Sequence, residues 1–147
     1  MPFKYRLEQV LKIREEELDE AILEMKNAED KVRSVSLNLS RTIENRNEVH
    51  AELLKEGMPR ANLYVRRIKQ LNEKIEQLEK DLKKAQEELA KAKENVREAK
   101  VRLEALKRHK EKKFRDYRDE ENRVEAKRLD EIGILKHARE LLESREE

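Results

Sequence analysis

A seven-residue spacing of apolar side chains runs through the second half of the chain, from Tyr64 to Leu106. Every core position of this repeat is apolar: Tyr64, Ile68, Leu71, Ile75, Leu78, Leu82, Ala85, Leu89, Ala92, Val96, Ala99, Leu103 and Leu106. This spacing is typical of a helix that packs along one seam against a partner helix. At Lys110 and Lys113 the same positions become charged, and the chain continues for over thirty residues. The repeat therefore predicts a paired stretch followed by an unpaired one.

A turn divides the chain into two helical patterns, because Gly57 and Pro59 form the one close pair of helix-breaking residues. Upstream of the turn the same spacing returns in Leu7, Leu11, Leu18, Ala21, Met25, Ala28, Val32, Val35, Leu39, Val49 and Leu53. The exceptions at these positions are polar: Lys4, Arg14, Thr42 and Arg46. The two patterns predict two long helices joined at this turn.

One antiparallel register satisfies both patterns. The numbers of facing residues add to 117, as Leu53 does with Tyr64 and Leu11 with Leu106. The same register sets large side chains against small ones, which keeps the helix spacing even: Met25 against Ala92, Val32 against Ala85, Leu18 against Ala99 and Ala28 against Leu89. A shift by one heptad would enlarge the loop or bring helix breakers into the seam. The expected fold class is all-α, a long two-helix antiparallel coiled-coil hairpin.

The register also predicts where the hairpin ends. It sets Leu7 opposite Lys110 and Lys4 opposite Lys113, near the start of the first helix. The expected boundaries are a single domain over 1–147, a first helix over about 3–55, a turn over about 56–61, a second helix over about 62–143 and a C-terminal helical overhang from about 115.

The overhang carries apolar residues with no seam of this chain opposite them: Phe114, Tyr117, Val124, Leu129, Ile132, Ile134, Leu135, Leu141 and Leu142. Leu129, Ile132 and Leu135 share one face at helical spacing, and exposed apolar groups of this kind favour a partner. Two alternatives stay open. The tail could self-associate, or it could fold back along the hairpin as a third helix with a hinge at Gly133.

Composition supports long helices over a compact globule. Of the 147 residues 48% are charged and 3% aromatic, with two glycines and two prolines. Disorder is the rival interpretation, but the formal net charge is only +2 and the apolar residues are periodic, which favours a coiled coil. There is no cysteine, so disulfides and thiolate metal sites are excluded. We expect no cleavable signal peptide and no membrane-spanning helix.

Basic residues gather between Lys107 and Arg118, where seven of them stand against two acidic residues. Arg6, Lys12 and Arg14 come alongside in the same register. Such a basic collar suits nucleic-acid phosphates, anionic lipid heads or an acidic protein surface, and it can equally be a solvated face. No aromatic stacking residues or groove-reading motif favours nucleic acid.

Catalytic chemistry finds no support in the sequence. His50, His109 and His137 lie far apart, and no glycine-rich loop suits a phosphate. The carboxylates alternate with Lys and Arg as they do on helix surfaces. We expect a protein that is not an enzyme, with no cofactor and no metal site.

Three segments of the chain resemble those of one known family. The N-terminal segment is Phe3-Lys4-Tyr5-Arg6-Leu7-x-x-Val10-Leu11-Lys12-Ile13-Arg14, followed by Glu16. The C-terminal one is Asn122-Arg123-Val124-x-x-Lys127-Arg128-Leu129-Asp130-Glu131-Ile132. Ile43-Glu44-Asn45-Arg46-Asn47-Glu48 is similar to the midsection of the family's first helix. These segments resemble the FliJ family of the flagellar export apparatus, and the resemblance spans the whole chain.

The resemblance implies a non-enzymatic coiled coil similar to the central stalk subunit of rotary ATPases. Such proteins insert their terminal helix ends into the export ATPase ring and stimulate it, contact the cytosolic domain of the export gate and escort export chaperones. It further implies a cytoplasmic protein, peripheral to the membrane at the flagellar base and connected with flagellar assembly and chemotaxis. We expect a monomer when free, no nucleic-acid partner and no membrane insertion.

The resemblance also implies two sets of binding residues. The ATPase-facing residues are Arg6, Leu7, Val10, Leu11, Arg14, Arg123, Arg128, Leu129, Asp130 and Ile132. The gate-facing residues, on a patch where some family members carry aromatics, are Asn38, Thr42, Asn45, Val49 and Ile68. Leu7 and Leu11 also have a plain core interpretation in the hairpin.

Two other functions stay open. One is a structural or scaffold coiled coil that self-associates through its C-terminal tail. The other is a nucleic-acid-binding hairpin that uses the basic collar, for which binding would fall steeply with salt.

Overall fold

The computed structural model describes residues 2–146, and these form two long helices with a short connection. Helix α1 covers Glu8–Glu56, the 3-10 turn η1 covers Met58–Arg60, and helix α2 covers Ala61–Glu146. No strand occurs in this described part, so the all-α expectation is confirmed. Met1 and Glu147, the ends of the expected domain, lie outside the described residues.

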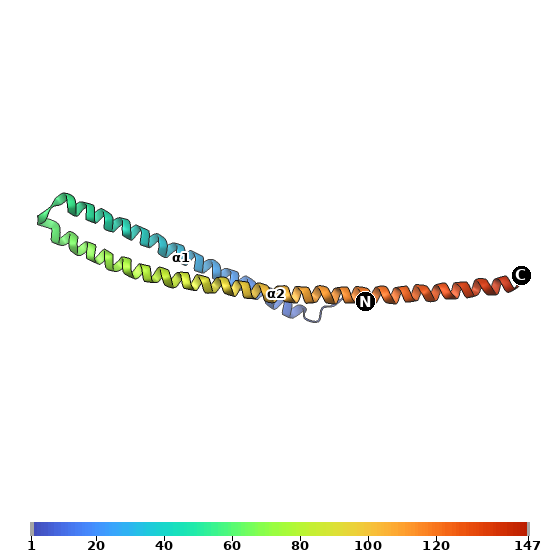
Figure 1. The fold of residues 1–147 in the computed structure, drawn as a ribbon. Helices are drawn as coiled ribbons and strands as arrows, with labels where there is room; N and C mark the ends of the chain where they lie inside the picture. The colour runs from blue at the N-terminus through green and yellow to red at the C-terminus, as the bar shows by residue number, and fades with distance from the viewer. Residues whose placement is uncertain (1, 147) are drawn as a thin grey trace. The chain divides into compact units, whose positions relative to one another are not determined.

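The chain divides into two compact units. The hairpin unit is Arg14–Val101, and the terminal unit combines the chain up to Ile13 with the chain from Arg102 onward. In the hairpin unit α1 and α2 run antiparallel on either side of the turn (Figure 1). The expected two-helix hairpin is therefore confirmed.

The seam of the hairpin unit follows the seven-residue repeat. Between Asn62 and Val101 every core position of α2 is buried or half-buried, and every other side chain is exposed. The buried apolar residues of this stretch are Leu71, Ile75, Leu78, Ala85, Ala92, Val96 and Ala99. Since burying a Leu or Ile side chain is worth about 1.5–3 kcal/mol, this row supplies the main stabilising contribution to the hairpin.

Polar bonds between the helices report the register directly. The Nζ of Lys31 lies 3.1 Å from Oε2 of Glu88, and Nη1 of Arg46 donates to Oδ1 of Asn72 at 3.3 Å. The residue numbers of these pairs add to 119 and 118, close to the expected 117. A register shifted by one heptad would differ by seven. The observed pairing therefore agrees with the register predicted from the apolar pattern.

The turn uses its glycine for a conformation that other residues rarely adopt. Gly57 follows the last residue of α1 and has φ of 69°. Only a residue without a Cβ takes this left-handed conformation at no steric cost, so α1 ends here. The hydroxyl of Tyr64 donates to the Glu56 carboxylate at 3.0 Å and ties the two helix ends together.

In the terminal unit α1 begins at Glu8, so the expected start at about residue 3 is wrong. The N–H of Glu8 donates to the carbonyl of Tyr5 at 3.2 Å, which forms the turn into the helix. Phe3 and Tyr5 both contact α2. Residues two apart share a side in an extended chain but not in a helix, so these contacts favour a non-helical segment here.

This segment also changes where the overhang begins. We expected Phe114 and Tyr117 to lack a partner within the chain, but the ring of Phe3 packs against both. From Arg118 to Arg145 every side chain is exposed. The overhang therefore begins after Tyr117 instead of at about residue 115.

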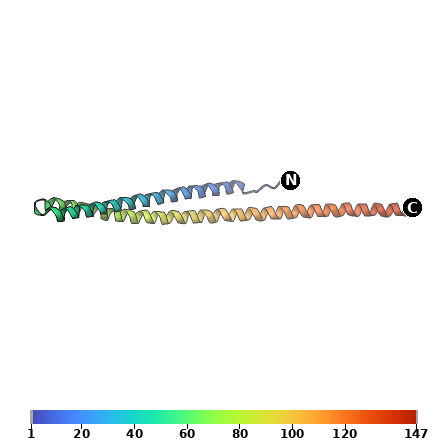
Figure 2. The ribbon, with the colours of Figure 1, turned by 90° about the horizontal axis from the view of Figure 1, so that it is seen from above.

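Helix α2 is continuous (Figure 2), and its range includes Gly133. It ends at Glu146, three residues later than the expected end at about 143. No third helix occurs in residues 2–146, so the hypothesis of a tail folded back at Gly133 is wrong. A glycine within a helix is only about 1 kcal/mol less favourable than alanine, so one glycine does not end a helix of this length.

Candidate partner-binding surfaces

An aromatic cluster holds the N-terminal segment against α2 in the terminal unit. The ring centroids of Phe3 and Phe114 lie 5.3 Å apart in an edge-on arrangement, and those of Phe3 and Tyr117 lie 5.5 Å apart. The ring of Tyr5 lies 5.6 Å from that of His109, and the tyrosine hydroxyl is hydrogen-bonded to Nδ1 of His109. Such distances are typical of favourable aromatic pairs. The cluster thus holds Phe3 and Tyr5 beside residues 109–117.

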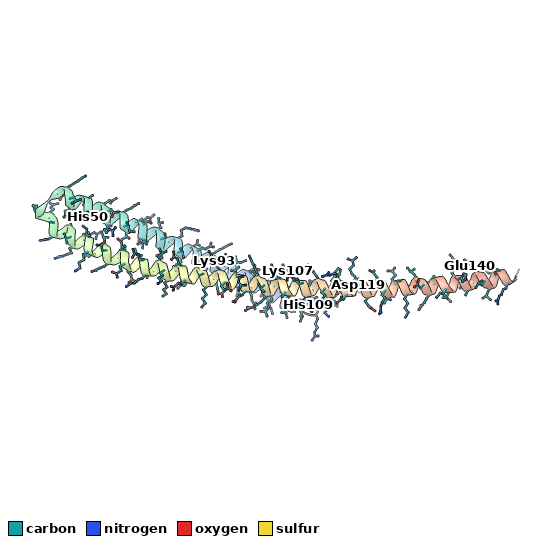
Figure 3. The ribbon with its side chains drawn as sticks, in the orientation of Figure 1. His50, Lys93, Lys107, His109, Asp119 and Glu140 are labelled. Carbon is teal, nitrogen blue, oxygen red and sulfur yellow. The ribbon has the colours of Figure 1, made fainter. Side chains whose placement is uncertain are left out.

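Cations surround this cluster. Nζ of Lys110 lies 2.8 Å from the Glu8 carboxylate and 5.9 Å from the centre of the Tyr5 ring. The guanidinium of Arg118 lies 5.9 Å from the centre of the Phe114 ring, within reach of a cation–π interaction. A groove of about 490 Å³ opens beside the cluster and is lined by Phe3, Lys4, Tyr5, Arg6, Leu7, His109 and Lys113. The surface here combines basic and aromatic groups beside His109, which is labelled in Figure 3.

The N-terminal residues expected to face an ATPase divide between core and surface. Leu11 is buried, with 5% of its surface exposed, while Leu7 and Val10 are half-buried. Arg6 is exposed. Arg14 belongs to the hairpin unit and pairs with Glu17 of the same helix at 2.9 Å. Leu11 therefore has the core role that its place in the repeat indicates.

The C-terminal residues of this set are all exposed. Leu129 and Ile132 have 60% and 51% of their surface exposed, and Arg128 lies beside them on the same face of α2. Asp130 lies on another side of the helix, because the two-residue step from Asp130 to Ile132 turns the helix by about 200°. Arg123 pairs with Glu120 at 2.8 Å. The structure thus brings Arg128, Leu129 and Ile132 onto one surface.

Sequence reasoning missed part of both surfaces. Four of the five aromatic residues in the chain belong to the terminal unit, and their two-residue and three-residue spacings would have indicated the cluster: Phe3, Tyr5, Phe114 and Tyr117. In the tail, Val124, Leu135 and Leu142 follow one side of α2 at intervals of eleven and seven residues. These side chains are 57%, 66% and 62% exposed. The sequence analysis named all three as unpartnered apolar residues and grouped Leu135 with Leu129 and Ile132, but it did not recognise this line.

The residues expected to face the export gate all lie in the hairpin unit. Asn38 is exposed, whereas Asn45, Val49 and Ile68 are half-buried. Thr42 is buried in the seam, and its hydroxyl donates to the carbonyl of Asn38 at 2.8 Å. Asn38 and Asn45 are thus the more accessible polar groups of this patch.

Two tyrosines have phenol groups that ionise less readily than usual. The hydrogen bond to Glu56 raises the pKa of Tyr64, because it favours the neutral donor. Burial, with Glu121 nearby, raises the pKa of Tyr117. The second shift fits the Phe3 ring that covers this residue.

Metal binding and membrane crossing both depend on features that can be examined in residues 2–146. These residues contain no group of three or more His, Cys, Asp or Glu side chains that could hold a metal ion. None of the helices in this described range combines the length and apolar character needed to cross a bilayer.

Comparison with known proteins places the chain in a family. The solved structure of a proposed YscO homolog from Chlamydia trachomatis has the same fold, with a TM-score of 0.75 over 92% of this chain and 96% of that one. The two sequences are 22% identical. A search of curated protein sequences gave no match. The family model described as the flagellar FliJ protein matches residues 3–142, and the chain therefore belongs to the FliJ family.

Proposed function

We propose that this chain is a non-enzymatic stalk that binds and stimulates the flagellar export ATPase ring through its terminal unit. Membership of the FliJ family makes the chain a component of flagellar protein export. The observation that carries the finer proposal is the tail of α2, in which every side chain from Arg118 to Arg145 is exposed. Its apolar side chains would be buried favourably only against a partner.

The geometry of the tail suits insertion into a ring. Exposed apolar residues point to different sides of the helix, with Ile134 and Leu141 away from the line of Val124, Leu135 and Leu142. A partner on one side only would leave part of this apolar surface in water. A ring that surrounds the helix would contact all sides of it.

The proposal includes the other partners of the family. The hairpin unit would contact the export gate through the patch around Asn38 and Asn45, and the protein would escort export chaperones. We place it in the cytoplasm, at the membrane face of the flagellar base. Asn38 supports the gate contact by its exposure, since no intrachain packing hides its side chain.

A paired substitution in the tail tests the proposal. Leu129→Asp with Ile132→Asp removes apolar contact from a surface without intrachain packing, so helix content is expected to stay unchanged while stimulation of the cognate ATPase is lost. Leu54→Asp with Leu63→Asp is the matched control, because these leucines are also exposed, at 76% and 66%, but lie beside the turn. Normal stimulation by the tail variant would contradict the proposal.

A scaffold that self-associates through its tail is the second candidate. The line of Val124, Leu135 and Leu142 favours it, because exposed apolar residues on one face suit a second helix. Sedimentation at micromolar concentration separates the two. The stalk function predicts a monomer under these conditions, and the scaffold function predicts a stable dimer that Leu135→Asp with Leu142→Asp breaks.

A further inference from the structure

One side of α1 in the hairpin unit carries unusually little charge. Among residues 34–43 the one charged residue is Arg41, in a chain that is 48% charged. A groove of about 460 Å³ follows this side and is lined by Glu29, Val32, Arg33, Ser36, Leu37, Ser40 and Leu89. Leu37 is 49% exposed and Ile43, one turn beyond Ser40, is half-buried. We call the line from Glu29 through Ser36, Ser40 and Ile43 to Asn47 the neutral strip.

The ends of the neutral strip carry opposite charges that lack opposite-charge partners. Glu29 makes no ion pair within residues 2–146. Arg46 occupies a seam position, where a charge is unfavourable, and its guanidinium bonds two neutral amides. It donates to Asn72 at 3.3 Å and to Asn47 at 3.4 Å, with no carboxylate partner in the described chain.

Because Arg46 donates to Asn47, its guanidinium lies at one end of the strip, and Glu29 lies at the other end. Arg46 has five N–H donors, and these two rather long bonds leave donors available for a carboxylate. Glu29 lies 17 residues away along α1, which is about 25 Å at 1.5 Å per residue. Arg33 also lines the groove, but its charge is paired with Asp30 at 3.2 Å. The rest of the strip is an apolar and hydroxyl surface with an unpaired anion at one end and an available cation at the other.

We propose that the neutral strip docks a second copy of this chain in antiparallel orientation. A twofold axis between Ser36 and Ser40 sets Glu29 of one copy beside Asn47 of the other, where the guanidinium of Arg46 lies. Both ends of the contact then gain a charge-assisted hydrogen bond. A surface that is complementary to itself under a twofold rotation is what an isologous dimer requires.

The extent of the contact predicts a reversible pair. A strip of about 25 Å on one helix is small beside the interfaces of permanent dimers. Association is therefore expected at high protein concentration and low salt, with a monomer on dilution. The inference involves only the hairpin unit, so it does not depend on the ATPase proposal, and the paired tail substitution is expected to leave it unchanged.

Cysteine crosslinking tests the geometry, because the natural chain contains no cysteine. In an otherwise unchanged full-length chain, Ser40→Cys lies near the twofold axis, and a short bis-maleimide is expected to join two copies. Ser34→Cys is the matched control, since it is an exposed serine on the opposite side of α1. We expect at least a tenfold higher dimer yield for Ser40→Cys. Equal yields, or no dimer from either variant, would overturn the inference.

Charge exchange tests the pairing of the ends. Glu29→Arg sets two cations against each other and is expected to weaken the sedimentation dimer at least tenfold. Glu29→Arg together with Arg46→Glu restores opposite charges and is expected to restore the dimer. The proposal would be contradicted if Glu29→Arg left the dimer affinity unchanged. It would also be contradicted if the double variant had normal helicity but did not regain the dimer. A wild-type chain that stays monomeric at high concentration would also overturn it.

Discussion

Helix α2 is packed against α1 over one stretch and fully exposed over another. Between Tyr64 and Val101 α2 buries one row of side chains and exposes the rest, whereas from Arg118 to Arg145 every side chain is exposed. Both stretches are rich in Lys, Arg and Glu and both contain apolar residues. The difference is a second helix opposite the first stretch. Apolar spacing thus indicates a seam, but only a facing partner turns that seam into stability.

The largest expected effect is the difference in unfolding free energy between a substitution in the seam and one in the tail. Ile75 is only 6% exposed, so Ile75→Ala is expected to lower the free energy of unfolding by about 2–4 kcal/mol through lost burial and a residual cavity. Leu135 is 66% exposed, and Leu135→Ala is expected to change the free energy of unfolding by less than about 0.5 kcal/mol. Urea unfolding followed by circular dichroism measures both. Equal costs would mean that the tail is packed in solution.

Alanine substitutions at the two glycines are expected to have opposite effects on stability. Gly57→Ala forces a side chain into left-handed φ and is expected to cost about 1–2 kcal/mol. Gly133 lies within the exposed part of α2, and an added Cβ would meet no atom within 4 Å. Gly133→Ala is therefore expected to favour the helical tail by up to about 1 kcal/mol. Thermal melting by circular dichroism tests both signs, and destabilisation by Gly133→Ala would indicate that the tail needs a bend there.

The smallest expected effect concerns the border between the stretches. Phe3→Ala uncovers Tyr117 and is expected to move the raised pKa of this phenol toward its usual value near 10. Because the pKa of Tyr117 is higher in the folded protein than in the unfolded chain, the neutral phenol stabilises the folded state at pH values below about 10. This contribution to stability is lost as the pH rises through the folded-state pKa. Ultraviolet titration of the Tyr5→Phe, Tyr64→Phe background isolates Tyr117. No change in its pKa on Phe3→Ala would show that Phe3 does not cover it.

The apolar repeat was enough to predict the hairpin and its register, because burial in a two-helix seam has a strict period. Residue pairs such as Lys31 with Glu88 lie where that register sets them. The start of α1 was not predictable in this way. The repeat continues formally to Lys4, but the segment before Glu8 is not helical, and Phe3 and Tyr5 pack on α2 there.

The binding surfaces were less accessible from sequence than the fold. The prediction identified Leu129 and Ile132 through a local resemblance, and both lie exposed on one face. It did not separate Thr42, which the seam buries, from Asn38, which stays exposed, because that difference depends on which way each side chain faces. Partner identity depends on a second molecule, and a single chain carries only its half of that contact.

Hydrogen exchange of the whole protein, alone and with the cognate export ATPase, tests the central claim most directly. If the terminal unit is the ATPase-binding surface, the amides of residues 118–142 gain protection in the complex while those of the seam between Tyr64 and Ala99 stay unchanged. Protection gained along the hairpin, with the tail amides exchanging as in the free protein, would contradict the account.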